Sequence, residues 1–167
     1  MRDLRALGAR SVPVVSRGSE YVFAQVISDV VNFLQLEDDT APELPPEALA
    51  QRLDRNLDAA IRFVRQMPDE HLERQLPNRP RSWRVLMHHV FQIPAAFLDA
   101  ETNGSVMQYE DLVAPPPDDM VTSEAIARFG EDTRAEFARW WQGARDDDFS
   151  ASVAVYFGDT TRHELLE

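Results

Sequence analysis

Apolar residues recur at helical spacing in three long segments of the chain. Proline suits the first turn of a helix, serine and threonine cap helix N-termini, and glycine is common just after the last turn. Such residues mark the starts of the three segments, at Pro46, after Ser82 and after Thr122 or Ser123, and the end of the second at Asn103-Gly104. The first segment ends before Pro68, and the acidic run from Asp146 ends the third. The pattern therefore predicts three amphipathic helices.

The second predicted helix has an apolar stripe that we expect to face the core: Trp83, Leu86, Val90, Ile93 and Phe97. Pro94 lies within this run, where it removes one backbone hydrogen bond, so we expect a kink there. The equivalent stripes are Leu49, Leu53, Leu57, Ala60, Ile61, Val64 and Met67 in the first helix, and Ile126, Phe129, Thr133, Phe137, Trp140 and Trp141 in the third.

The first 36 residues have a different pattern, with short β-branched runs. Residues 11–16 predict a strand, residues 17–19 a turn and residues 20–23 a second strand, after which apolar residues recur at helical spacing. The acidic, proline-rich stretch that follows favours an extended linker. We therefore predict a small unit at 1–36, a linker at 37–45 and a helical domain at 46–167.

The last residues predict a short strand and the start of a fourth helix. Ser152 to Phe157 is a strand-like run, and Thr161-Arg162-His163-Glu164 matches a capping box. A helix that has just been capped is expected to continue for two turns or more, whereas the chain stops at Glu167. We therefore expect a mainly α fold, a four-helix bundle with a truncated last helix.

Charge and composition narrow the classes of function. The chain has 29 acidic and 17 basic residues, and its net charge of −12 repels phosphate backbones and anionic membrane surfaces. We therefore expect neither nucleic acid nor a membrane as a partner. The chain contains no cysteine, which excludes disulfides and thiolate chemistry of its own. No apolar run approaches the ~20 residues that span a bilayer, and the charged start is not a signal peptide, so we expect a cytoplasmic protein.

Three features stand together in the first 36 residues: a turn at Gly18, a helix from about Val26 to Leu36, and the run Leu7-Gly8-Ala9-Arg10-Ser11-Val12-Pro13-Val14-Val15. Together they resemble the C-terminal half of a glutaredoxin or thioredoxin-like domain. In that family the pair at Val12-Pro13 is joined by a cis peptide bond beside the redox cysteines. The helix that carries Cys-x-x-Cys is absent here, so dithiol exchange is excluded for this chain.

The helical domain contains the run Ser82-Trp83-Arg84-Val85-Leu86-Met87-His88-His89-Val90, then a crossover loop and a helix rich in phenylalanine and tryptophan. These features resemble the DinB-like family, which is related to bacterial thiol S-transferases and to mycothiol-dependent maleylpyruvate isomerase. The resemblance implies an up-down-down-up four-helix bundle that binds a divalent metal, often zinc or nickel. Three histidines hold the metal in that family, one on the second helix and two, four residues apart, on the last. The metal activates a thiol or water.

His89 fits the second-helix ligand of that family best, because it lies seven residues after Ser82. At about 100° per residue, His89 lies roughly 90° from the centre of the apolar stripe of its helix. His88 lies almost opposite that stripe and is expected to face solvent. The sequence leaves His89 as either a metal ligand or a residue that merely borders the core.

The other two histidines fit a metal site less well. His163 lies in the first turn of the last helix, whereas the paired ligands of the family come one to three turns later, beyond Glu167. His71 lies among acidic residues after the first helix, where solvation explains it. A catalytic zinc usually needs three protein ligands, so the chain as given should bind metal weakly.

Two hypotheses of function remain open. In the first, the residues belong to a larger metal-dependent thiol transferase or detoxification enzyme that acts on a low-molecular-weight thiol or another small molecule, and the chain as given is inactive. In the second, the chain is a non-catalytic binding or assembly module that completes its fold as a homodimer. The second hypothesis rests on the bare apolar face of a three-helix layer, because such a face is normally covered.

Overall fold

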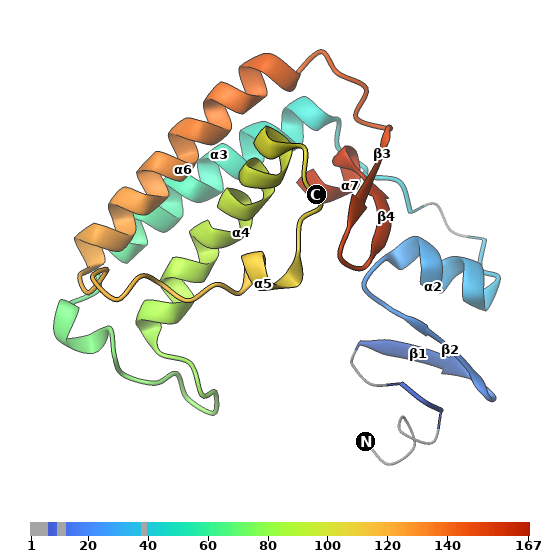
Figure 1. Ribbon diagram of the computed structural model, residues 1–167, viewed down its shortest axis with the longest axis horizontal. Helices are drawn as coiled ribbons and strands as arrows, with labels where there is room; N and C mark the ends of the chain where they lie inside the picture. The colour runs from blue at the N-terminus through green and yellow to red at the C-terminus, as the bar shows by residue number, and fades with distance from the viewer. Residues whose placement is uncertain (1–6, 10–12, 38–39) are drawn as a thin grey trace. The chain divides into compact units, whose positions relative to one another are not determined.

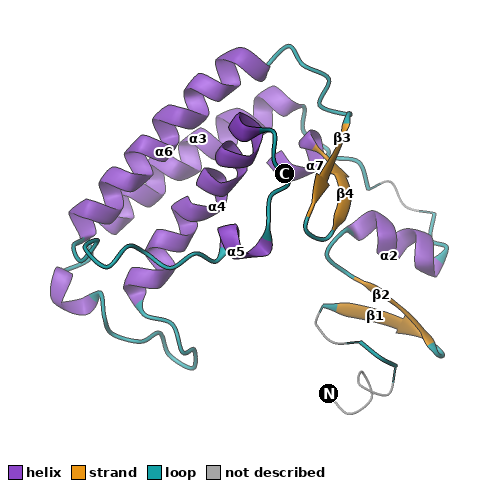
Figure 2. Cartoon of the chain, viewed as in Figure 1, coloured by secondary structure: helices purple, strands orange, loops and turns teal. Residues whose placement is uncertain are grey.

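The computed structural model describes residues 7–9, 13–37 and 40–167 (Figure 1). They form two compact units that divide between Glu43 and Leu44. The chain is mainly α-helical: long helices pack together in the second unit, and each unit contains a small antiparallel hairpin (Figure 2). The predicted mainly α class is therefore confirmed. Within the described ranges, no helix is both long enough and apolar enough to cross a membrane.

The first unit is a hairpin followed by a helix. Strand β1 (Val14–Arg17) pairs antiparallel with β2 (Glu20–Phe23), and helix α2 (Ile27–Leu34) follows. Gly18 lies in the turn with φ +64°, a conformation that glycine adopts without steric cost. The predicted order of strand, turn, strand and helix is confirmed. The expected cis bond between Val12 and Pro13 involves a residue outside the described ranges.

The second unit is built on three long helices, α3 (Pro46–Val64), α4 (Trp83–Asn103) and α6 (Ser123–Ala144). The hydroxyl of Ser82 accepts a hydrogen bond from Val85 N at 3.3 Å, and that of Thr122 accepts one from Ala125 N at 3.1 Å. Gly104, with φ +61°, ends α4. These caps confirm the predicted helix boundaries and identify Thr122, rather than Ser123, as the N-cap of α6.

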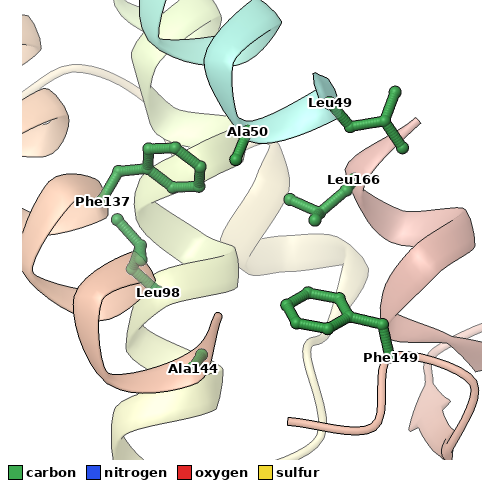
Figure 3. Close-up of a cluster of buried hydrophobic side chains, with 7 residues drawn as sticks. All are labelled: Leu49, Ala50, Leu98, Phe137, Ala144, Phe149 and Leu166. Carbon is green, nitrogen blue, oxygen red and sulfur yellow. The ribbon is translucent and has the colours of Figure 1, made fainter. Parts of the chain in front are cut away.

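Helix α6 packs against both α3 and α4 (Figure 1). Buried side chains from all three helices form the core. One cluster combines residues of the three helices with Phe149, which follows α6, and Leu166 of the last helix (Figure 3). Its members are Leu49, Ala50, Leu98, Phe137, Ala144, Phe149 and Leu166. The other cluster consists of Leu57, Ile61, Val64, Leu72, Phe91, Ile126 and Ala127.

Charged side chains join α3 to α6 at the surface. The guanidinium of Arg134 donates to both carboxylate oxygens of Asp54, at 2.6 and 3.0 Å, and to Asp58 at 2.7 Å. This arrangement uses the planar fork of arginine, which matches a carboxylate with two parallel hydrogen bonds. It fixes the two helices relative to each other about midway along α3.

The predicted core-facing stripe of α4 is wrong at two positions. Val90 and Ile93 are 43% and 45% exposed, whereas the buried residues of α4 are His88, Phe91, Ala96 and Leu98. Apolar residues lie on more than one side of this helix, and the core covers the side that carries Phe91 and Leu98. The helix is continuous through Pro94, and the predicted kink stays a prediction.

Short elements connect the long helices or follow the last of them. They are the 3-10 helix η1 (Asp69–His71), α5 (Tyr109–Leu112), the hairpin of β3 (Ser152–Val155) and β4 (Gly158–Thr161), and α7 (Arg162–Leu166). The strand-like run and the capping box at Thr161 are confirmed. The hydroxyl of Thr161 accepts from Glu164 N at 3.1 Å, and Glu164 Oε2 accepts from Thr161 N at 2.8 Å.

Candidate functional site

His88 is the one histidine that α4 places in the core of the second unit. Its side chain is only 3% exposed, and its ring stacks on Phe129 of α6 with centroids 5.0 Å apart and planes at 13°. The Nδ1 atom of His88 is buried and has no hydrogen-bond partner within the part of the chain that the structure describes. A buried polar atom without a partner costs about 1–3 kcal/mol, so such an atom calls for an explanation.

The surroundings of His88 favour the neutral imidazole. Burial is the main cause that lowers the pKa of His88 below its ordinary value, and the nearby charges of His89 and Arg84 lower it further. The neutral ring has one nitrogen with a free lone pair, which is the form of histidine that binds metal ions. The site therefore keeps His88 available as a ligand or proton acceptor near neutral pH.

The structure differs from the sequence-based expectation at His88 but not at His89, whose partial burial fits a residue that borders the core. His88, expected in solvent, is buried, and His89 is only partly buried. The cause is the rotation of α4, which turns Phe91 and Leu98 towards the core instead of Val90 and Ile93. His89 stays a predicted metal ligand on the basis of its spacing, and no observed contact supports that role.

The two remaining histidines lie in other parts of the second unit. The Nε2 atom of His163 in α7 lies 2.8 Å from the carbonyl oxygen of Leu44, just ahead of α3. His71 lies partly exposed in η1. Among the described residues, no three histidine, aspartate or glutamate side chains gather in an arrangement that could hold a metal ion.

A cavity of about 320 Å³ lies between the end of α4, the loop after it, β3 and α7. Its walls are mainly apolar, and its charged residues are Glu101 and Arg162. Glu101 accepts hydrogen bonds from Trp140 Nε1 at 3.3 Å and from Arg162 Nε at 3.2 Å. No local sequence pattern predicts this pair, because 61 residues separate its members.

Comparison of the chain with protein-family models, with curated proteins and with solved structures finds no match.

Proposed function

We propose that the second unit is a DinB-like helical bundle in which His88 is a ligand of a divalent metal, zinc or nickel, and that it belongs to a metal-dependent thiol transferase or detoxification enzyme. The observation that carries this proposal is the buried, unpartnered Nδ1 atom of His88. The spacing from Ser82 favours His89 as the second-helix ligand, whereas burial favours His88. We therefore place the ligand at His88, one residue earlier in the sequence.

The order of elements supports the proposed family. Helices α3 and α4 are followed by a connection that contains α5, then by α6, a short hairpin and the capped start of α7. This is the order that the resemblance to the DinB-like family implies. The hairpin and helix of the first unit similarly support a thioredoxin-like half-domain at residues 1–36.

The described residues fit a metal only in part. His88 offers one neutral imidazole, whereas a catalytic zinc usually has three protein ligands and one open position. A metal bound to a complete set of ligands would activate a thiol or a water molecule. The chain contains no cysteine, so the thiol would come from the substrate. Because His88 is the only ligand proposed among the described residues, this chain is expected to bind a divalent ion weakly.

Titration of the chain with Ni²⁺, monitored through the histidine ring signals by NMR, tests the proposal. Because Ni²⁺ is paramagnetic, it broadens the signals of rings that bind it. We expect the His88 signals to broaden at a lower Ni²⁺ concentration than those of His71, His89 and His163. Broadening of the exposed rings, with the His88 signals unchanged, would overturn the assignment of His88.

Two variants separate a specific effect from general surface binding. His88→Phe keeps a planar ring against Phe129 but removes both ring nitrogens, and His89→Ala removes the neighbouring imidazole. Zn²⁺ should raise the unfolding temperature of the parent chain and of the His89 variant, because a ligand that binds the folded state stabilises it. It should not raise that of the His88 variant. Equal shifts in all three proteins would contradict the proposal.

A specific observation also favours the second hypothesis, an assembly module. Val90 and Ile93 form an exposed apolar strip on α4, one helical turn apart. Apolar side chains at this spacing are typical of helix faces that pack against another helix. In this hypothesis a second copy of the chain covers the strip.

Light scattering at micromolar concentration tests that hypothesis. We expect a dimer for the parent chain and a monomer for the Val90→Ser/Ile93→Ser variant, because the polar replacements remove the apolar area to be buried. Val121→Ser is the matched control, since Val121 is 57% exposed but lies outside α4, in the loop ahead of α6. A monomeric parent chain would refute the assembly hypothesis and leave the metal proposal untouched.

A further inference from the structure

The segment between η1 and α4 forms a tight turn that fixes the positions of two arginines. Leu76 N donates to Arg81 O at 2.9 Å, and Arg79 N donates to Leu76 O at 3.2 Å. Gln75 and Ser82 form an antiparallel bridge just outside the turn, and Ser82 caps α4. These backbone contacts hold Arg79 and Arg81 next to the start of α4.

Both arginines line one cavity. The cavity has a volume of about 270 Å³, and its lining consists of Leu76, Pro77, Arg79, Arg81 and Leu86. The three other residues are apolar, and no described residue of the lining is acidic. A ligand in this cavity would therefore meet two positive charges and an apolar wall. The volume lies near the lower end of ligand pockets, about 300 Å³, which restricts the ligand to a small molecule.

Among the described residues, no carboxylate forms an ion pair with Arg79 or Arg81, although the chain has an excess of acids. Seven described arginines form ion pairs with carboxylates: Arg62, Arg65, Arg84, Arg128, Arg134, Arg145 and Arg162. Neither Arg79 nor Arg81 has an ion-pair partner among the residues that the structure places. In a chain with a net charge of −12, this cavity is a local region of positive charge.

We propose that this cavity, the arginine cavity, binds a small organic anion whose carboxylate or phosphate group contacts Arg79 and Arg81 and whose apolar part packs on Leu76 and Leu86. Guanidinium groups match both oxyanions through paired, charge-assisted hydrogen bonds, which are about twice as strong as neutral ones. The apolar wall favours a molecule with a short hydrocarbon segment over a bare inorganic ion. The proposal does not depend on a metal at His88.

Backbone amide NMR titrations with hexanoate and with inorganic phosphate test this proposal. Hexanoate should cause saturable shifts at the amides of Leu76, Arg79 and Leu86, and it should bind more tightly than phosphate because it also covers the apolar wall. If phosphate causes the same shifts as hexanoate with equal affinity, the apolar part of the proposal fails. If neither anion causes saturable shifts there, the site itself is excluded.

A pair of double variants completes the test. Arg79→Gln/Arg81→Gln removes both charges from the cavity, and Arg52→Gln/Arg55→Gln removes two exposed arginines from α3. The first variant should bind hexanoate about tenfold more weakly, the size of effect expected for lost charge-assisted hydrogen bonds. The control should bind as the parent does. Equal weakening in both variants would mean that only the net charge matters, which would overturn the proposal.

The folding of the Arg79→Gln/Arg81→Gln variant is checked by circular dichroism. Because Arg79 is exposed and Arg81 is partly exposed, we expect its spectrum to match that of the parent chain.

Discussion

The ring of Phe91 in α4 lies against the backbone of Gly130 in α6, so closely that a β-carbon at residue 130 would be 2.7 Å from two of its ring carbons. Phe91 is completely buried, and Gly130 is buried as well. The two helices approach at this point because residue 130 has no side chain. The same contact turns Phe91 towards the core and fixes the rotation of α4, which places His88 inside.

Gly130→Ala should therefore destabilise the second unit, although alanine favours helices more than glycine does. A methyl group would force the ring of Phe91 to move, and overpacking of this kind costs about 1–3 kcal/mol. The measurement is the free energy of unfolding in urea. Gly143→Ala is the control in the same helix, because no atom of the described residues lies within 4 Å of its β-carbon position. It should leave stability unchanged or raise it by up to about 1 kcal/mol. A loss at residue 143 as large as at residue 130 would contradict this explanation.

The stability of the second unit should depend on the protonation of His88. Its pKa is lower in the folded chain than the ordinary value of 6.5, so the unfolded chain binds the proton more readily. The free energy of unfolding should therefore fall as the pH drops below 6.5, until the pH passes the lowered pKa of the folded state. Urea unfolding of the parent chain and of His88→Phe, over this pH range, measures the effect. The variant should lose this part of the pH dependence, and identical profiles would refute the prediction.

The ion pairs of Arg134 should contribute modestly to stability. Its side chain is 36% exposed and that of Asp54 is 41% exposed, so water screens the attraction and the loss in Arg134→Leu is expected to be about 1 kcal/mol. Arg139→Leu is the control, because Arg139 is an exposed arginine on the same helix without an ion pair among the described residues. A double-mutant cycle with Asp54→Asn isolates the pair. A coupling energy of zero would show that the contact is energetically neutral.

The capping box should determine whether α7 forms. Thr161→Ala removes the hydroxyl that accepts from Glu164 N, and loss of an N-cap costs about 1 kcal/mol. Hydrogen exchange at the amides of α7 should speed up by about fivefold for that loss, because it reports local opening. Thr102→Ala, at an exposed position near the end of α4, should leave exchange in α7 unchanged. Unchanged protection in the Thr161 variant would mean that packing of Leu166 alone holds the helix.

Sequence reasoning succeeds here where the signal is local. Ser82, Thr122 and Thr161 each cap a helix because the hydrogen bond runs to an amide three residues later, and the sequence contains both partners. Pro46 begins α3 for an equally local reason, since its ring fixes the backbone angle that a first turn requires. Helix boundaries in this chain could therefore be predicted closely.

The sequence does not predict which residues are buried where a contact between residues far apart in the chain determines burial. Val90 and Ile93 were expected in the core because they share an apolar stripe, but burial depends on which side of α4 meets α6. The contact between Phe91 and Gly130 settles that question across 39 residues, and periodicity contains no information about it. His88 is buried rather than exposed for the same reason. Arg79 and Arg81 are close enough in the sequence to suggest an anion site, but the apolar wall of the arginine cavity could not be predicted, because it combines a turn with Leu86 of α4.

The hydrogen bond between His163 and the carbonyl of Leu44 joins the last helix of the second unit to the first residue of that unit. A unit whose beginning and final helix meet in this way is suited to circular permutation, in which a short peptide connects the old ends and new ends are opened elsewhere. The exposed pair Asp118-Asp119, ahead of α6, is a suitable place to open it. Such a rearranged chain would begin with α6 and would still contain every side chain that surrounds His88.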